Sequence, residues 1–327
     1  MSANVRLRDG VVVEFTAGET VVLDGGHAGD TTVLSHAHGD HIVETSSAVV
    51  ASDLTAALAG VRRDGGPPDT TDDPAVDLVN AGHVAGSRAA RLSGRATDHT
   101  VLYTGDCSTR DRFYLEGFDP VDADELVIEA TYGKPGYRFP PTETVVARIH
   151  DWLADTMDQV VVLFGYALGR AQKLLYLLGD SPRRRVFATD GIRALNDVIA
   201  SHRDVGFDSR PFDGDVDLAP GDALVLPMQT ARRDRVESLI ETNDAATAGF
   251  SGWAVDDSFV YRRGVDEGFV LSDHCDFDEL LAVVRSVDPN RVYTHHGAAE
   301  TFAQQIVAKL GYQARALKRN QSTLGEF

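Results

Sequence analysis

Four side chains able to bind metal ions lie within six residues of the sequence, at His36, His38, Asp40 and His41. They directly follow the apolar run 31–35, which is typical of a β-strand. In an extended segment the first two histidines project to the same side, and a turn at the intervening glycine presents the other two groups nearby. Imidazole and carboxylate without thiolate suit zinc, with manganese or iron as substitutes. The spacing therefore predicts a catalytic site able to hold two adjacent ions.

Two further ligand candidates follow β-rich runs and have glycine beside them. His83 lies in the segment 80–87, and Asp106 lies in Tyr-Thr-Gly-Asp, residues 103–106. Taken alone, each is more typical of a turn than of a metal site. Joined to the first motif, they supply the missing ligands, with Asp106 placed to bridge two ions.

The order of these motifs, His-x-His-x-Asp-His, then Gly-His-x-x-Gly-Ser, then Thr-Gly-Asp, resembles the metallo-β-lactamase superfamily. Later segments are similar to the β-CASP nucleases of that superfamily: an acidic motif at 126–133, a stretch before a helix at 164–175, a histidine motif at 271–277 and a His-Gly motif at 292–297. The nearest resemblance is to the compact branch that contains DNA ligase-associated exonucleases and archaeal mRNA 3′-end processing factors.

The resemblance implies an α/β fold, a four-layer αββα sandwich with an inserted α/β β-CASP domain. The sequence pattern divides the same way, with β-branched runs in the first ~130 residues, an α/β alternation from Thr142 and a return of strand patterns from Thr247. We therefore expect residues 1–145 and 251–327 to form one metallo-β-lactamase domain and residues 146–250 to form the insert. Residues 260–274 are expected to be extended.

The resemblance also implies a set of seven ligands for two zinc ions, with manganese as a substitute: His36, His38, His83, Asp40, His41, His296 and Asp106. In that set the first three side chains hold one ion and the next three hold the other. Asp106 bridges the two ions. His295, which precedes the matching His-Gly pair, is expected to support the ligands and not to bind metal.

Three side chains are implied to act in catalysis, and three residues to hold a neighbouring phosphate. His274 is expected to be the general acid, Glu129 to orient it, and Asp40 to serve the reaction as well as the metal. The phosphate-binding residues are expected at a turn before a helix and in the His83 loop: Gly169, Arg170 and Ser87.

The implied function is a zinc-dependent hydrolase in which hydroxide, formed between two ions, attacks the phosphorus of a nucleic acid. An exonuclease on DNA is favoured, which would connect the chain with DNA repair and with a DNA ligase or helicase as partner. The first alternative is an endo- or exoribonuclease in mRNA 3′-end processing, with RNA-processing partners. Alternatives of another class are a catalytically idle RNA-processing scaffold subunit and a small-molecule metallo-hydrolase.

Composition bears on the habitat and on the partner. Of 50 acidic residues 37 are aspartate, only four of 31 basic residues are lysine, and the net charge is −19, which is typical of halophilic proteins. Such a chain repels nucleic acid at low salt. In molar salt the Debye length is about 3 Å, so local contacts decide whether nucleic acid binds. Two distant cysteines, no secretory signal and no apolar run of membrane-spanning length predict a cytoplasmic protein without a membrane partner. The pattern favours no oligomeric state.

Overall fold

The computed structural model describes residues 3–26, 29–42, 47–214 and 216–318. By its contacts the chain divides into two compact units. The first comprises Met1–Asp111, Leu115–Gly136 and His274–Phe327, and the second comprises Arg112–Tyr114 and Tyr137–Asp273. The second unit is longer at both ends than the segment 146–250, because the strand and helices just outside that segment pack on the second unit's own sheet.

The first unit contains two sheets. One is a mixed, mostly antiparallel sheet of four strands. Its order is β1 (Asn4–Arg8), β2 (Gly10–Glu14), β3 (Thr20–Leu23) and β4 (Thr31–Val33). The sheet of six strands has the order β16 (Ala314–Ala316), β15 (Arg291–His295), β8 (Glu125–Glu129), β7 (Thr100–Tyr103), β6 (Arg88–Ser93) and β5 (Val76–Asn80). Among the described residues, its helices are α1 (Asp53–Arg62), α7 (Phe277–Val287) and α8 (Ala299–Leu310).

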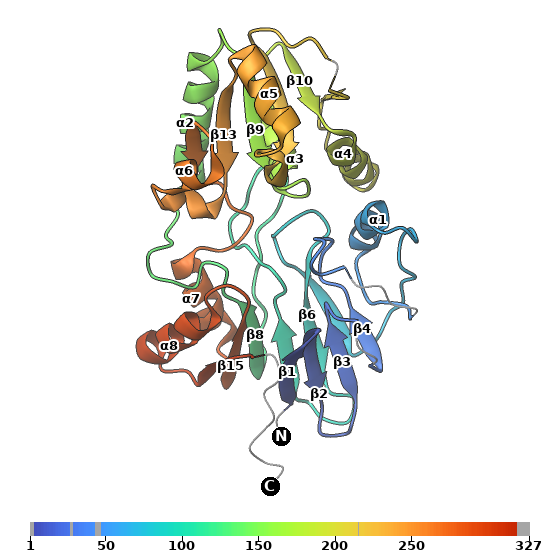
Figure 1. Cartoon of the computed structure of the whole chain (residues 1–327). Helices are drawn as coiled ribbons and strands as arrows, with labels where there is room; N and C mark the ends of the chain where they lie inside the picture. The colour runs from blue at the N-terminus through green and yellow to red at the C-terminus, as the bar shows by residue number, and fades with distance from the viewer. Residues whose placement is uncertain (1–2, 27–28, 43–46, 215, 319–327) are drawn as a thin grey trace. The chain divides into compact units, whose positions relative to one another are not determined.

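The two sheets of this unit share one hydrophobic core, to which Val13 and Leu23 contribute from one sheet and Val101 and Val127 from the other. The opposite face of the six-stranded sheet packs against α7 and α8, which lie beside β8 and β15 in Figure 1. Because β8 is covered on both faces, all five of its residues are buried, and its sequence ELVIE lacks simple alternation. The α/β class is thus confirmed, while the four-layer sandwich stays a prediction.

Strand direction explains why the candidate site residues lie at one edge of the six-stranded sheet. Strands β7, β8 and β15 are mutually parallel, so their carboxyl ends meet at the same edge. Strand β5 is antiparallel to β6, which is antiparallel to β7, so β5 ends at that edge too. The loops after β5 and β7 and the last residues of β8 and β15 are therefore neighbours.

The second unit is built on a six-stranded parallel sheet with the order β11 (Arg210–Pro211), β10 (Arg185–Ala188), β12 (Asp222–Pro227), β9 (Val161–Gly165), β13 (Ala246–Phe250) and β14 (Glu267–Phe269). Its helices are α2 (Thr142–Asp155), α3 (Arg170–Gly179), α4 (Asp190–His202), α5 (Asp234–Asn243) and α6 (Phe259–Arg263). The apolar runs of β9 and β12 are buried because helices cover both faces of a parallel sheet.

One local expectation was wrong. Residues 260–274 were expected to be extended, but the short helix α6 occupies their first turn. Phe259 is buried beside the sheet, and Gly264, with φ of 68°, ends the helix in the left-handed conformation that glycine adopts without strain. Only β14 of this segment pairs as a strand. No helix in the described part of the chain is long and apolar enough to cross a membrane.

Candidate metal centre

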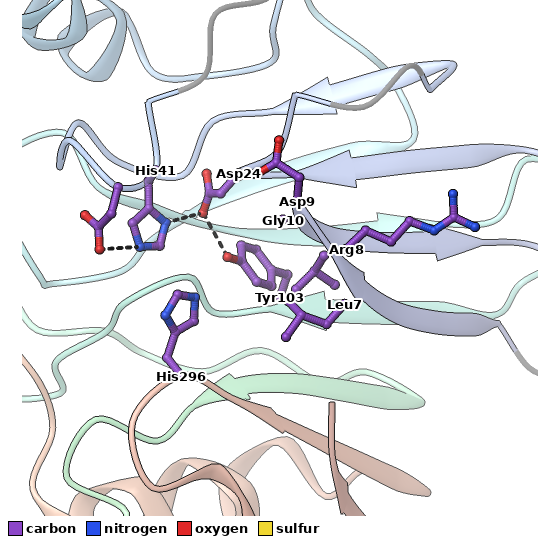
Figure 2. A pocket seen from close by; sticks show the side chains of 10 residues that line it. Leu7, Arg8, Asp9, Gly10, Asp24, His41, Tyr103 and His296 are labelled. Carbon is purple, nitrogen blue, oxygen red and sulfur yellow. Dashed lines mark hydrogen bonds and ion pairs between the residues drawn. The ribbon is translucent and has the colours of Figure 1, made fainter. Parts of the chain in front are cut away.

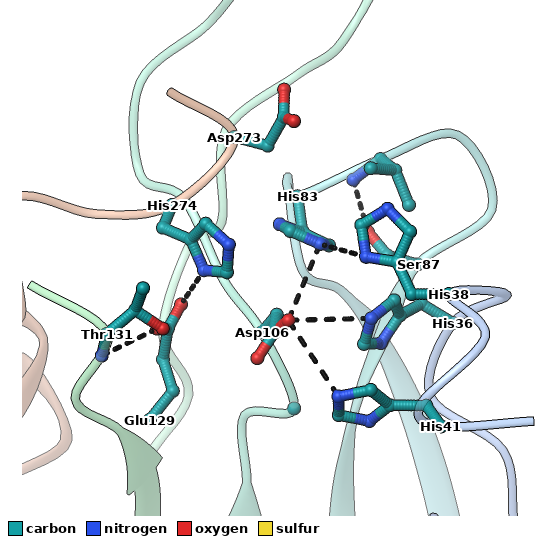
Figure 3. A network of polar contacts seen from close by, with 12 residues as sticks. His36, His38, His41, His83, Ser87, Asp106, Glu129, Thr131, Asp273 and His274 are labelled. Atoms are coloured by element: carbon teal, nitrogen blue, oxygen red, sulfur yellow. Dashed lines mark hydrogen bonds and ion pairs between the residues drawn. The ribbon is translucent and has the colours of Figure 1, made fainter. Parts of the chain in front are cut away.

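Three histidines and one aspartate from three loops of the first unit come together at the edge just described. The ligand atoms of His36, His38, His83 and Asp106 lie within 4.8 Å of one another, as Figure 3 shows. These residues follow β4, β5 and β7. The Asp106 turn passes close to the β4 loop, and a side chain at Gly105, whose φ is 54°, would meet the Ser35 hydroxyl oxygen at 2.8 Å. Glycine is therefore required where the two loops approach.

Asp106 is the geometric centre of the cluster. Its Oδ2 lies 3.5 Å from His36 Nε2, 3.6 Å from His83 Nε2 and 3.9 Å from His41 Nε2. The side chain is 11% exposed, and burial raises the pKa of its carboxyl group. A carboxylate approached by three imidazoles from different directions can bridge two cations.

The state of His36 tests whether a cation fits here. Its Nδ1 is 2.9 Å from the Ser35 hydroxyl, whereas its Nε2 is buried and has no hydrogen-bond partner among the described residues. Burial, followed by the neighbouring His41, holds the pKa of His36 well below its ordinary value. The ring is therefore neutral, and the lone pair on Nε2 points into the cluster. A divalent ion bound by imidazole satisfies such an atom.

A second group, around His41, was only partly foreseen. His41 Nδ1 lies 3.0 Å from Asp24 Oδ2, which also accepts hydrogen bonds from the hydroxyls of Tyr103, at 2.8 Å, and Ser35. Burial opposes protonation of His41, but the hydrogen bond and charge of Asp24 outweigh it and raise the pKa to about 9. Asp24 thus fixes the ring with Nε2 directed at Asp106, which is how carboxylates orient metal-binding histidines.

Asp24 and Tyr103 were missed by sequence reasoning. The available signal was position, because Asp24 is the first residue after β3, and Asp106 is the third residue after β7. Asp24 also accepts a hydrogen bond of 2.7 Å from the backbone N–H of Ser35, so it ties the first loop to the sheet.

Asp40 and His296 lie on the open side of this second group. The Asp40 side chain is 77% exposed, and its Oδ2 is 3.9 Å from His41 Nε2. His296 is exposed and stacks on His41 with ring centroids 5.4 Å apart. Figure 2 shows His41 and His296 facing a pocket of about 210 Å³ that Asp24 and Tyr103 also line. Every ligand expected for a second ion is therefore near His41, on the solvent side.

His295 differs from its neighbour. It is completely buried and stacks on Tyr103 at 5.4 Å, and neither ring nitrogen has a hydrogen-bond partner among the described residues. Burial, then the charges of His296 and His41, lower its pKa well below the ordinary value, so the ring is neutral. It lies in the core behind the second group.

His274 and Glu129 form a pair beside Asp106. His274 Nδ1 is 2.8 Å from Glu129 Oε1, and His274 stands 4.5 Å from His83, centroid to centroid. Glu129 is completely buried and also accepts hydrogen bonds from the backbone N–H groups of Cys107 and Thr131. Burial would raise the pKa of Glu129, but the charge of His274 and these hydrogen bonds lower it. Glu129 therefore stays ionised and favours a protonated His274.

No known family's sequence profile matches the chain. The chain is 34% identical over 319 residues to a probable DNA ligase of Opitutus terrae, an alignment of 93% of this chain but 30% of that protein. It is 32% identical over 114 residues to a probable RNase of Methanocaldococcus jannaschii, covering 33% of this chain and 26% of that one. The chain thus spans less than a third of these relatives.

These similarities support a relationship to the metallo-β-lactamase and β-CASP proteins. A crystal structure of a protein of unknown function from Enterococcus faecalis superposes with a TM-score of 0.66 over 98% of this chain and 99% of that chain, at 11% identity. At that identity the likeness concerns the fold alone. The two names, a probable DNA ligase and a probable RNase, describe those relatives.

The expected phosphate-binding residues have partners inside the protein. Arg170 has a side chain only 2% exposed, donates to the Leu271 carbonyl at 2.8 Å and lies 3.2 Å from Asp273. The Gly169 N–H donates to the Gln172 side chain at 2.7 Å. The Arg170 guanidinium therefore makes its contacts inside the second unit, unlike a guanidinium that binds a phosphate. Turning it to solvent would leave the charge of Asp273 less well compensated.

Ser87 is likewise an internal residue. It is 1% exposed, and its hydroxyl accepts the Val84 N–H at 3.3 Å while its own N–H donates to the Val84 carbonyl. Figure 3 shows this contact next to His83. The serine therefore closes the loop that carries a ligand, a role in which its polar atoms are used within the turn.

Proposed function

We propose that this chain is a metal-dependent phosphodiesterase that cuts nucleic acid. The observation that carries the proposal is the position of Asp106, whose single carboxylate is within 4 Å of three imidazoles of two ligand groups. Within the proposal, the first unit is the metallo-β-lactamase domain and the second is the β-CASP domain, with the bounds that the two compact units have.

Seven side chains would hold two zinc ions, or manganese in their place: His36, His38, His83, Asp40, His41, His296 and Asp106. When bound, such a pair of ions supplies an activated water and stabilises the charge that develops on the phosphoryl oxygens. The protein's part is to keep His36 neutral by burial and to orient the rings of His36 and His41 through Ser35 and Asp24.

His274 would provide the proton for the departing sugar oxygen. Glu129 holds its Nδ1 at 2.8 Å, which leaves Nε2 as the atom able to donate. An alkoxide is a poor leaving group, so a positioned acid is worth about 10²–10⁴-fold in rate. The buried Glu129 carboxylate, which stays ionised, favours the charged imidazolium of His274 over the neutral ring.

DNA is the preferred substrate, cut by an exonuclease, because 93% of the chain aligns with a probable DNA ligase. A ribonuclease active in RNA 3′-end processing is the second candidate, favoured by the similarity to a probable RNase over a third of the chain. An idle scaffold subunit fits less well, since no expected ligand is missing. We further propose a cytoplasmic protein of a salt-rich cell, on the basis of its aspartate-rich composition.

The test is a substrate panel at high salt with added zinc or manganese: matched end-labelled DNA and RNA single strands, bis-p-nitrophenyl phosphate and a thioester. We expect cleavage of DNA and of bis-p-nitrophenyl phosphate, with or without cleavage of RNA. A chelator should abolish this cleavage, and added metal should restore it. Hydrolysis of the thioester alone would favour a small-molecule hydrolase. No turnover of any substrate at two bound equivalents of metal would favour the scaffold.

A further inference from the structure

A shallow depression in the second unit lies at the carboxyl ends of three adjacent strands. Tyr166 directly follows β9, Met228 directly follows β12, and Phe250 is the last residue of β13. Three more residues complete the lining, namely Ser251, Phe259 and Arg263. None of the six belongs to the metal centre.

The topology of the sheet independently marks this place. From β9 the chain passes through α3 to β10 on one side, whereas from the adjacent β13 it passes through α6 to β14 on the other side. Connections that leave adjacent strands in opposite directions open a crevice outside their carboxyl ends. Open parallel α/β sheets bind their ligands at such switch points.

The Tyr166 ring forms a fixed aromatic wall of this depression. Its side chain is 51% exposed, although it follows a fully buried strand. The buried guanidinium of Arg170 lies 5.1 Å from the ring centroid and is itself held by Leu271 and Asp273. A ring supported in this way from within the protein loses little conformational entropy when a second flat group stacks on its exposed part.

An arginine side chain lies at the rim of the depression. Arg263, at the end of α6, is exposed, and its guanidinium is 6.0 Å from the Phe259 ring centroid. It makes no ion pair with any residue that the structure describes, whereas the adjacent Arg262 pairs with Asp256 at 3.2 Å. Arg232 also lies here, donating to the Arg262 carbonyl. The positive charge of Arg263 is therefore available to a negatively charged group at the rim.

We propose that this depression binds one base of a single-stranded nucleic acid, stacked on Tyr166, with a flanking phosphate at Arg263. Every base has a π-face, so such a platform is tolerant of sequence. Three of the six lining side chains are aromatic, and the lining lacks the several converging donors that would enclose a free phosphate. The occupant is therefore a nucleotide within a strand. The inference rests on the proposed function, because the strand would be the nuclease's substrate.

The experiment measures binding of a fluorescent single-stranded oligonucleotide by anisotropy, with full-length protein and a chelator present so that nothing is cut. Tyr166→Ala should weaken binding about 5- to 150-fold, and Tyr166→Phe, which keeps the ring, should bind like wild type. The matched control is Tyr261→Ala, which removes a tyrosine that is 88% exposed on α6 but does not line the depression. Equal binding by Tyr166→Ala and the control would overturn the proposal.

A second measurement leaves the protein unchanged. An abasic nucleotide moved along the oligonucleotide should weaken wild-type binding at one position, and at that position Tyr166→Ala should add no further loss. Arg263→Ala should weaken binding at low salt and much less at 1 M salt, where the Debye length is about 3 Å, while the stacking contribution persists. An abasic scan without any sensitive position would contradict the subsite.

The two proposals fail separately. If wild-type protein cuts oligonucleotides but is insensitive to both the tyrosine and the abasic nucleotide, the subsite is wrong and the nuclease stands. If it cuts none under any metal condition yet shows the Tyr166 and abasic effects, the subsite stands and the nuclease assignment fails. Tight binding of a free mononucleoside monophosphate, reduced by Tyr166→Ala, would overturn the strand as the occupant.

Discussion

Two buried aspartates, one in each unit, show how differently a folded chain can treat a charge. Asp273 in the second unit is completely buried and lies 2.5 Å from Lys173 and 3.2 Å from Arg170, whose positive charges compensate its own. Asp106 in the first unit is surrounded by imidazoles, of which the buried His36 is neutral. Asp273 is thus compensated by cations of the protein, whereas Asp106 faces the neutral His36, whose Nε2 has no hydrogen-bond partner among the described residues.

The difference teaches how to separate a structural ion cluster from a site that needs a ligand. The cations beside Asp273 compensate its charge, so this cluster needs no further ion. At Asp106, burial raises the pKa of the carboxyl group, and His36 Nε2 is buried without a partner among the described residues. A bound divalent cation would stabilise the ionised carboxylate and would accept the lone pair of His36 Nε2. The following predictions test this contrast, beginning with the largest expected effect.

Asp106→Ala should lower the rate on every phosphodiester substrate at least about 10³-fold, because a bridging carboxylate serves both ions. Metal analysis of the purified variant should also show a large loss from two equivalents. Asp77→Ala, which alters an aspartate 71% exposed on β5, is the matched control and should retain metal and rate. Two full equivalents of metal in Asp106→Ala would contradict the bridge.

Asp273→Ala should instead destabilise the protein, by about 3–5 kcal/mol, because it leaves Arg170 and Lys173 as uncompensated buried charges. The measurement is denaturant unfolding followed by circular dichroism, with metal content of the folded fraction as the second readout. That content should remain at two equivalents. Asp256→Ala, which removes an exposed partner of Arg262, should cause no measurable loss. Equal stability of the two variants would mean that the buried cluster contributes nothing.

His274→Ala should retain metal but lose about 10²-fold or more in rate on oligonucleotides, whose leaving group needs a proton. On bis-p-nitrophenyl phosphate, whose leaving group departs unaided, the loss should be much smaller. Because Asp106, Glu129 and His274 also lie close enough to share an ion, the metal content decides between the roles. Equal losses on both substrates, or one equivalent of metal missing, would assign His274 to metal binding or positioning.

Lys173→Met should remove a pH dependence of stability. Burial lowers the pKa of Lys173 from 10.5 to about 8 in the folded protein, even though Asp273 opposes the shift. Between pH 8 and 10.5 the unfolded chain therefore binds the proton more tightly, so raising the pH through this window stabilises the fold. Wild type should gain about 1–3 kcal/mol over Lys173→Met between pH 7.5 and 10.5, measured by denaturant unfolding at each pH. Parallel pH profiles would show that the lysine titrates normally.

Local patterns were sufficient for much of the fold. The α/β alternation expected from Thr142 is present in the second unit, where α3 and α4 bury their apolar faces. The α6 segment was misjudged, because its valine and tyrosine favour a strand while the decisive features are the burial of Phe259 and the glycine that ends the turn. Propensity is a weak guide in a segment of five residues.

For the site, the sequence by itself determined which residues can bind a metal: the spacing of His36, His38, Asp40 and His41 is a local property that no other part of the chain alters. Only the tertiary structure decided their partners. Asp24 contacts His41 across 17 residues of sequence and Tyr103 across 79, and Glu129 contacts His274 across 145. The same holds for Arg170, whose motif predicts a phosphate contact until Asp273 is found beside it. The type and spacing of side chains fix what chemistry is available, whereas burial and long-range pairing fix their protonation and direction.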